Sequence, residues 1–244
     1  MISVEPTTTT VRQIALDQPA TIRVFEKLGI DYCCGGRKPL AQACEEHALD
    51  LETVVAAIET ELEHTVHGPT SPDWTTASIT ALCDHIVNDH HAYIRNELPR
   101  LHALAAKVVS RHGDQHPELA SIQQLLETAG EELLEHLAKE EAVLFPYLRK
   151  LDKALASDGQ RPKRCFGAVS DPIRVMMAEH DAAGALFAQI RKLSGGYTAP
   201  EGACPSWRGF YQGLLEFEQD LHRHVHLENN ILFPNAIALE EGHA

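Results

Sequence analysis

The sequence predicts an all-α protein, a four-helix bundle that follows a small helical module. Apolar residues recur three and four positions apart along four long stretches, as they do on the buried face of an α-helix. No stretch of useful length alternates polar and apolar residues, as a half-buried strand would. The 244 residues are 44% hydrophobic and 23% charged, so the chain can bury a core of its own.

The first part of the chain, residues 1–67, is expected to be a small helical domain. A helix predicted over residues 21–28 ends at Gly29, because glycine readily adopts the left-handed conformation that closes helices. A second helical pattern covers residues 39–63. Residues 68–75 contain two prolines and a glycine and are predicted to be the linker. The bundle then occupies residues 76–244.

Four long helices are predicted in the bundle. The first covers residues 76–112, and the second starts at Pro117, because proline suits the first turn of a helix, and continues to about residue 155. The third opens with a capping aspartate and a proline at residues 171–172 and ends at a glycine pair. The fourth covers residues 206–239.

An internal repeat places histidine and glutamate at matching positions of the second and fourth helices. His136 with Glu140 and His224 with Glu228 each begin the pattern H-x3-E-x3-L-F-P. A further histidine lies 45 residues before the first copy and 44 before the second; these two histidines are His91 and His180. The bundle therefore reads as two copies of one helical hairpin.

This repeat predicts a site for two metal ions. Residues four apart share one face of a helix, so each His-Glu pair can hold one side of a shared centre. The pairs lie on apolar stripes, where a carboxylate is costly unless it is paired or bound to metal. Two bridging glutamates with two imidazoles per ion, and no thiolate, suit iron or manganese. The predicted ligands are His91, His136, Glu140, His180, His224 and Glu228.

Some assignments have alternatives. A single histidine on a core stripe is more often structural than a ligand, and only the matched repeat favours metal. In the first helix, the apolar stripe is centred closer to His90 than to His91, so periodicity leaves the choice open. Glu132 and Asp220 lie four residues before His136 and His224. They are either hydrogen-bond partners of those imidazoles or solvent-exposed acids.

Composition argues against two classes of partner. Lysine and arginine number 21 and aspartate and glutamate 35, which gives a net charge of −14, whereas binding nucleic acid requires clustered basic residues. No apolar run approaches the ~18 residues of a membrane-spanning helix. No basic segment followed by an apolar one marks a secretory signal at the start. We therefore expect a soluble, intracellular protein that binds neither nucleic acid nor membrane.

Five motifs together resemble a known family. They are DYCCGG (31–36), NDHHAYIRNELP (88–99), HLAKEEAVLFP (136–146), AEHDAAG (178–184) and HVHLENNILFP (224–234). The chain resembles, over essentially its whole length, the di-iron iron–sulfur cluster repair proteins of the RIC family, whose bundle is a haemerythrin-like domain. In that family the first-helix ligand is the second residue of a Tyr-His or His-His pair, seven residues before Leu-Pro. That residue is His91 here, and the other ligands map onto the five predicted above.

The resemblance implies a cytoplasmic stress protein with two non-haem iron ions bridged by carboxylates. It would restore clusters damaged by nitric oxide or peroxide in iron–sulfur client proteins by supplying iron, and a homodimer is compatible with it. Two other functions stay open: an NO reductase that forms nitrous oxide at the di-iron centre, and a sensor that binds O2 or NO. Whether the protein is an enzyme is therefore left open.

The adjacent Cys33 and Cys34 are the second candidate site. Neighbouring cysteines form a disulfide only with strain, and the glycines around them predict an exposed, flexible backbone that gives access to the thiolates. The pair would receive or pass iron, or donate electrons. The alternative is two small buried hydrophobic residues. The remaining cysteines are expected to be packing residues: Cys44, Cys83, Cys165 and Cys204.

Overall fold

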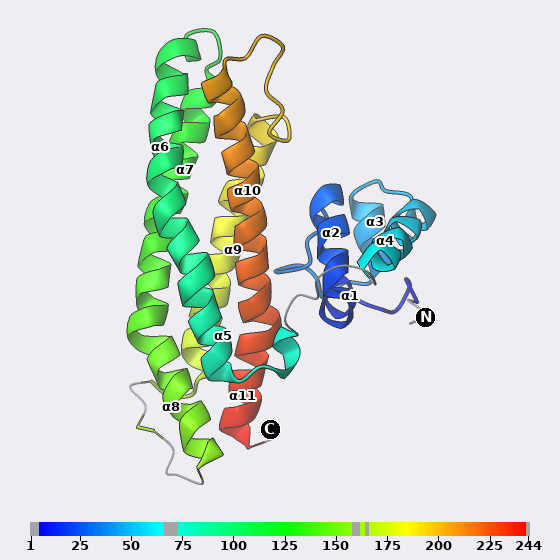
Figure 1. The fold of residues 1–244 in the computed structure, drawn as a ribbon, viewed down its shortest axis with the longest axis vertical. Helices are drawn as coiled ribbons and strands as arrows, with labels where there is room; N and C mark the ends of the chain where they lie inside the picture. Colours follow the sequence, from blue (N-terminus) through cyan, green and yellow to red (C-terminus); the bar gives the residue numbers. More distant parts are fainter. Residues whose placement is uncertain (1–4, 66–72, 158–161, 164–165, 243–244) are drawn as a thin grey trace. The chain divides into compact units, whose positions relative to one another are not determined.

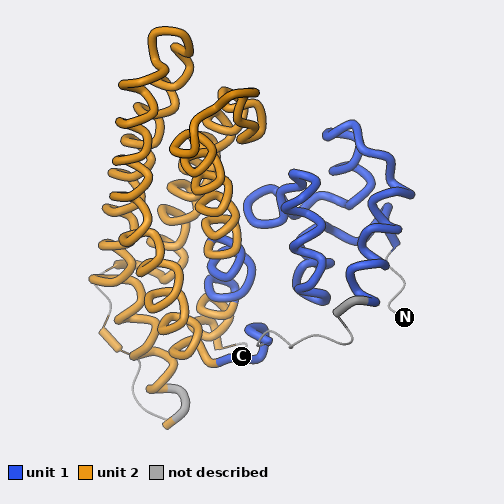
Figure 2. The backbone as a smooth tube through the Cα atoms, turned by 45° about the horizontal axis from the view of Figure 1, so that its top comes forward, with its two compact units in different colours: residues 1–77, 225–234 blue, residues 78–224, 235–244 orange. Residues whose placement is uncertain are grey.

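In the computed structural model, the described residues are 5–65, 73–157, 162–163 and 166–242, and among them the predicted all-α fold is confirmed (Figure 1). Their one extended feature is an isolated bridge between Thr10 and Pro39. The chain divides into two compact units, residues 1–77 with 225–234, and residues 78–224 with 235–244 (Figure 2). The domain boundaries at residues 67 and 75 stay a prediction, and most of the predicted linker lies outside the described residues.

Short helices make up the N-terminal part of the first unit. The Thr10 hydroxyl accepts a hydrogen bond from the Gln13 amide and so caps the first helix. Gly29, with φ 71°, ends the helix predicted over residues 21–28. The helices are α1 (Val11–Asp17), η1 (Pro19–Thr21), α2 (Ile22–Leu28), α3 (Leu40–Glu46) and α4 (Leu51–Thr65). Their buried residues include Val11, Ile14, Phe25, Leu40 and Ile58.

Four long helical runs form the bundle, each close to its predicted bounds. A short 3-10 turn, η2 (Trp74–Thr76), precedes them. The first run is α5 (Ile79–His85), η3 (Ile86–His91) and α6 (Ala92–His112), and the second is α7 (Glu118–Lys139), η4 (Glu140–Leu144) and α8 (Phe145–Ala156). The third is α9 (Ser170–Leu193), and the fourth is α10 (Pro205–Leu227), η5 (Glu228–Leu232) and α11 (Phe233–Glu241).

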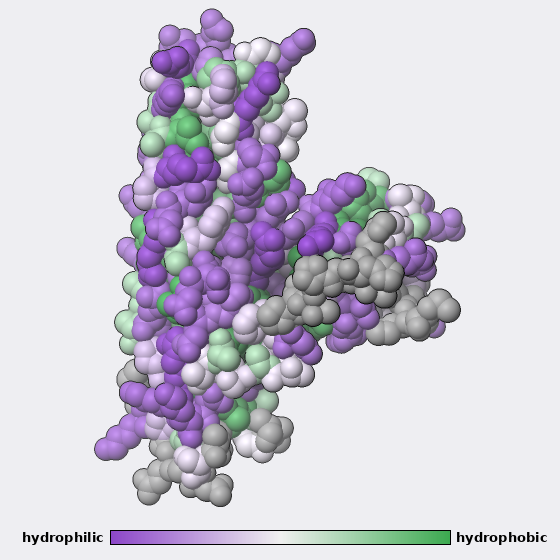
Figure 3. All heavy atoms as spheres, in the orientation of Figure 1, coloured by the Kyte–Doolittle hydropathy of each residue, from purple (hydrophilic) through white to green (hydrophobic). Residues whose placement is uncertain are grey.

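The bundle hides its apolar stripes between the runs. Helix α7 packs against both α6 and α9. Fully buried aromatic residues line the interior; they include Phe145, Phe187, Phe210 and Phe217. The face seen in Figure 3 is mostly hydrophilic with scattered hydrophobic residues. No helix among the described residues is long and apolar enough to cross a membrane.

Three of the runs widen into π-helical turns, η3, η4 and η5. The turns η4 and η5 occupy equivalent positions of the repeat, and Phe-Pro follows each one. Pro146 and Pro234 have no amide hydrogen and clash with the carbonyl four residues earlier, so a regular α-helix is disfavoured around them. A π-turn opens the helix at that point, and such turns are frequent at functional sites.

Candidate metal centre

The six histidine and glutamate residues of the repeat lie together inside the bundle. The ligand atoms of His91, Glu140, His224 and Glu228 lie within 4.8 Å of one another, and so do those of His136, Glu140, His180 and Glu228. Both groups share the two glutamates. All six residues are at most 3% exposed, so the structure brings together in one buried cluster every residue that the repeat singles out.

The π-turns position three of these side chains. His91 is the last residue of η3, while Glu140 and Glu228 are the first residues of η4 and η5. Within the repeat, each glutamate follows its histidine by one helical turn and stands where the helix begins to widen. The Leu-Phe-Pro sequence that ends each copy of the repeat thus accompanies the π-turn from which each carboxylate projects.

Distances within the cluster suit a shared carboxylate. Oε2 of Glu140 lies 3.4 Å from Nε2 of His91 and 3.5 Å from Nε2 of His136, so one carboxylate faces a histidine of each group. Nε2 of His136 lies 3.0 Å from Nε2 of His180. Two nitrogens bound to one octahedral ion at about 2.1 Å stand about 3 Å apart, so this pair is spaced as ligands of a single ion are.

Carboxylates outside the cluster fix two of the imidazoles. Nδ1 of His136 lies 2.8 Å from Glu179, and Nδ1 of His91 lies 2.7 Å from Glu141. A carboxylate facing Nδ1 makes that nitrogen a donor, which leaves the Nε2 lone pair directed at the cluster. Burial would raise the pKa of Glu179, but hydrogen bonds from Lys139 and His136 outweigh it and lower that pKa.

The structure decides between the two readings of Glu132 and Asp220, and neither faces its expected imidazole. Glu179 on α9, and not Glu132, faces His136, and Glu132 is exposed. Both oxygens of Asp220 lie 3.1 Å from Nδ1 of His90. Glu179 was not predicted, because it reaches across to a ligand on a neighbouring helix. Its one signal in the sequence is its position directly before His180.

The structure places His91, and not His90, in the cluster. The apolar stripe favours His90 because the period of 3.6 residues assumes a regular α-helix. The π-turn η3 takes more residues per turn, so it rotates the positions that follow it and brings His91 inward. His90 is 8% exposed, and its ring stacks on that of His224.

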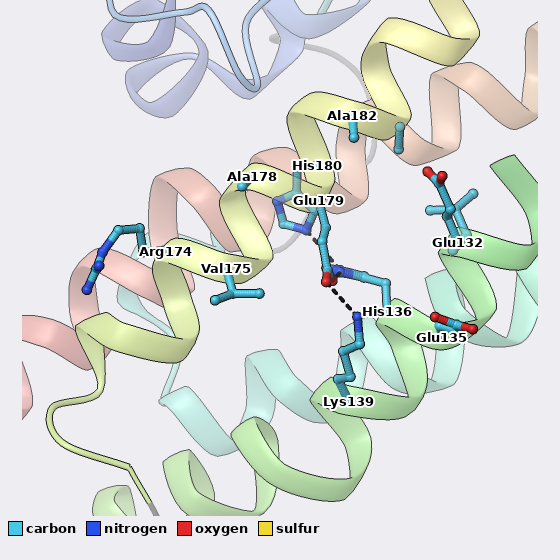
Figure 4. Close-up of a pocket in the computed structure, with 12 residues that line it drawn as sticks. Glu132, Glu135, His136, Lys139, Arg174, Val175, Ala178, Glu179, His180 and Ala182 are labelled. Carbon is cyan, nitrogen blue, oxygen red and sulfur yellow. Dashed lines mark hydrogen bonds and ion pairs between the residues drawn. The ribbon is translucent and has the colours of Figure 1, made fainter.

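A pocket of about 520 Å³ leads to two of the cluster's histidines. It lies between α7 and α9 and is lined by His136 and His180 together with polar residues nearer the surface (Figure 4). The Lys139 ammonium donates to Glu179 at 2.6 Å, and Figure 4 shows Glu179 between Lys139 and His136. The pocket therefore borders the half of the cluster that contains His136 and His180.

The Cys33–Cys34 loop is organised by Asp31. One oxygen of its carboxylate accepts hydrogen bonds from the amides of Cys33 (2.9 Å) and Cys34 (3.0 Å), and the other accepts one from Gly35 (2.8 Å). Both cysteines are free, with their sulfur atoms 3.8 Å apart. The expectation of an exposed pair is only half met, because Cys33 is 6% exposed and only Cys34 is partly accessible.

The surroundings of Cys33 disfavour its thiolate form. The hydrogen bond to Cys34, then burial, then the charge of Asp31 raise the pKa of Cys33 well above its ordinary value, so it stays protonated. Among the other cysteines, Cys44 and Cys83 are buried. Cys204 is instead partly exposed and lies 3.4 Å from Nε2 of His112. Cys165 lies outside the described residues.

Comparisons with known proteins agree with this geometry. Residues 83–236 match the family described as "Hemerythrin HHE cation binding domain", and residues 7–62 match ScdA_N, a "Domain of Unknown function (DUF542)". The chain is 37% identical over 225 residues to a "Probable iron-sulfur cluster repair protein" of Haemophilus influenzae, covering 92% of this chain and 95% of that one. It is 36% identical over 228 residues to the "Iron-sulfur cluster repair protein YtfE" of Citrobacter koseri and of Escherichia coli O157:H7, covering 93% of this chain and 96% of each.

Proposed function

Because the chain belongs to the family of iron–sulfur cluster repair proteins that join a DUF542 domain to a hemerythrin HHE cation-binding domain, we propose that it holds two non-haem iron ions and supplies iron to damaged iron–sulfur clusters. The observation that carries the proposal is the pair of four-residue groups that share both glutamates. A shared carboxylate is what two neighbouring metal ions require.

The donor set fits iron. Imidazole and carboxylate without thiolate suit iron and manganese rather than soft metals. In this proposal, His91 and His224 hold one ion, and His136 and His180 hold the other; the bridging ligands are Glu140 and Glu228. Bound iron supplies a redox-active ion that can also leave as cargo, while Glu141 and Glu179 keep two of the imidazoles oriented.

Delivery of iron gives the dithiol loop its role in the proposal. Cys34 is the accessible thiol and so makes the first contact with departing iron, whereas the protonated Cys33 follows. The partners are iron–sulfur client proteins, and we place the protein in the cytoplasm as a homodimer. These assignments rest on the family, since members named iron–sulfur cluster repair proteins cover nearly the whole chain.

The pocket beside His136 and His180 favours a second candidate function, reduction of nitric oxide to nitrous oxide at the same centre. The pocket borders two of the cluster's histidines, so it would give a diatomic molecule its approach to the centre. Anaerobic mixing of the iron-loaded, reduced protein with NO, followed by gas analysis, tests it. Nitrous oxide formed over several turnovers supports an enzyme, and NO bound without nitrous oxide removes this function.

The first test of the main proposal is metal content with Mössbauer spectroscopy on protein isolated anaerobically from iron-replete cells. We expect about two coupled iron ions per chain, fewer in His136→Ala, and an unchanged number in His47→Ala, whose histidine is exposed in the first unit. The repair step is measured as reactivation of a damaged [4Fe–4S] enzyme, which Cys33→Ser with Cys34→Ser should abolish without loss of iron. Zinc alone, or no metal in the wild type, would overturn the proposal.

A further inference from the structure

Three imidazole rings contact one another in a row between the surface of the bundle and the metal cluster. The side chain of His85 is 24% exposed, that of His90 is 10% exposed, and His224 in the cluster is fully buried. The ring centroids of His85 and His90 lie 5.3 Å apart, edge to face. Those of His90 and His224 lie 5.7 Å apart with the planes only 9° from parallel.

Carboxylates hold the two outer rings of this row in place. Both oxygens of Asp220 lie 3.1 Å from Nδ1 of His90. Asp220 stands one helical turn before His224 on α10. The same helix therefore carries both the carboxylate that contacts His90 and the ring on which His90 stacks. Nδ1 of His85 lies 2.6 Å from Asp89. The rings therefore have defined orientations rather than a choice of rotamers.

The outer end of the row is acidic. The side chains of Asp84 and Asp89 are 55% and 63% exposed, on either side of His85 in the sequence. Arg149 contacts Asp84 at 2.8 Å and offsets part of this charge. The whole chain carries a net charge of −14, so the surface around His85 attracts positively charged molecules.

We propose that His90 and His85 conduct electrons to the metal centre from a basic electron-transfer protein that docks on the acidic surface of Asp84 and Asp89. The inference rests on the proposed function, because it requires iron bound by the cluster. In each step the donor loses one electron and one iron(III) becomes iron(II). Two donors reduce a pair of ions, and no covalent bond forms or breaks. Electron transfer weakens steeply with distance, and the two ring contacts shorten the gaps along the route.

Two facts favour conduction over a purely structural role for His90. An apolar residue would fill this largely buried position without needing a carboxylate partner on another helix. The parallel stacking also aligns the ring of His90 with the ring of one ligand, His224. A purely structural role requires the hydrogen bond to Asp220 but not the aromatic ring. His90→Leu and His90→Phe both remove the hydrogen bond, and only His90→Phe keeps an aromatic ring, so the two variants separate the roles.

The test follows reduction of the oxidised, iron-loaded protein by the loss of its ferric absorption. The donors are hexaammineruthenium(II), a cation, and iron(II)–EDTA, an anion. At low ionic strength, His90→Leu and His85→Leu should slow reduction by the cation several-fold with iron content unchanged, and His90→Phe should retain most of the rate. His112→Leu, at the far end of α6, is the matched control. The double variant Asp84→Asn with Asp89→Asn should be reduced more slowly by the cation and faster by the anion. Both differences from the wild-type rates should disappear in high salt.

A second measurement needs no iron. Hexaamminechromium(III), a paramagnetic cation, should broaden the backbone NMR signals of residues 84–90 in the iron-free protein, and the double Asn variant should abolish this. A wild-type rate in His90→Leu with both iron ions present would overturn the electron route and leave the proposed function standing. If His90→Leu loses iron, His85→Leu decides in its place. A wild type that binds no iron would overturn the proposed function itself.

Discussion

Glu140 joins both halves of the centre, because a single carboxylate oxygen faces His91 at 3.4 Å and His136 at 3.5 Å. Glutamine keeps the shape of Glu140 but removes the negative charge that would hold two cations together in the proposed centre. We expect Glu140→Gln to lose at least one iron ion per chain, measured by elemental analysis, while Glu132→Gln on the exposed face of α7 keeps both. Equal iron in the two variants would show that Glu140 does not bridge.

Asp31 gives a second prediction, on pH dependence. Burial would raise the pKa of its carboxyl, but hydrogen bonds from the amides of Cys34, Gly35 and Cys33 outweigh it and lower that pKa. Since the folded pKa lies below the unfolded one, the carboxylate stabilises the loop above pH ~4, and this contribution is lost as pH falls through the folded pKa. Thermal unfolding of wild type and Asp31→Asn should therefore differ at neutral pH and converge as the pH falls below ~4 through the lowered folded pKa.

The same substitution should change thiol chemistry, because the charge of Asp31 helps to raise the pKa of Cys33. In Asp31→Asn, Cys33 should be alkylated faster at pH 8, as followed by mass spectrometry of the peptide that contains it. Cys44, which lies buried in the same unit, provides the control. Faster alkylation of both thiols would indicate general unfolding of the first unit instead.

At the scale of elements, the π-turns connect the repeat to the geometry of the centre. Pro146 removes an amide at the point where η4 gives way to α8, and alanine would restore it. We expect Pro146→Ala to let the turn relax toward a regular α-helix, shift Glu140 and weaken iron binding about tenfold or more, without lowering the stability of the iron-free protein.

Pro99→Ala is the matched control for this prediction. Pro99 also lies inside a helix, α6, but stands eight residues beyond His91 and outside a π-turn. The substitution should stabilise the protein by about 1–3 kcal/mol, measured by urea unfolding, and leave iron affinity unchanged. If iron affinity falls equally in both variants, the π-turn is not what positions the glutamate.

These elements also show what the sequence can and cannot predict. Prolines, capping residues and glycines mark the helix ends, so the four runs lie within a few residues of their predicted bounds. The repeat likewise identifies the six clustered residues, because histidines and glutamates without a common site would not be expected at matching positions in both copies. The π-turn η3 was not predictable, since periodicity assumes 3.6 residues per turn. Periodicity therefore could not separate His90 from His91, and only the family resemblance did. Contacts between helices, such as that of Glu179 with His136, depend on packing that one sequence does not specify.

Over the full chain, the segment 225–234 contributes both to the metal cluster, through Glu228, and to the compact unit of the N-terminal helices. In that unit Asn230 donates to the Tyr32 carbonyl at 3.1 Å, and the Asn229 amide lies 4.0 Å from the Cys34 sulfur. A change at Glu228 is therefore two residues away from a hydrogen bond that holds the dithiol loop.

This arrangement predicts that iron occupancy controls the reactivity of Cys34. Bound iron fixes Glu228 and the residues after it, because a ligand that binds only the folded segment stabilises it. Alkylation of Cys34 should thus be several-fold slower in the iron-loaded than in the iron-free protein, as measured by the rate of mass labelling. Cys204, partly exposed beside α10, should react at one rate in both forms. In Asn230→Ala, the alkylation rate of Cys34 should no longer depend on iron. The same iron effect in that variant would show that this hydrogen bond does not connect the centre with the dithiol loop.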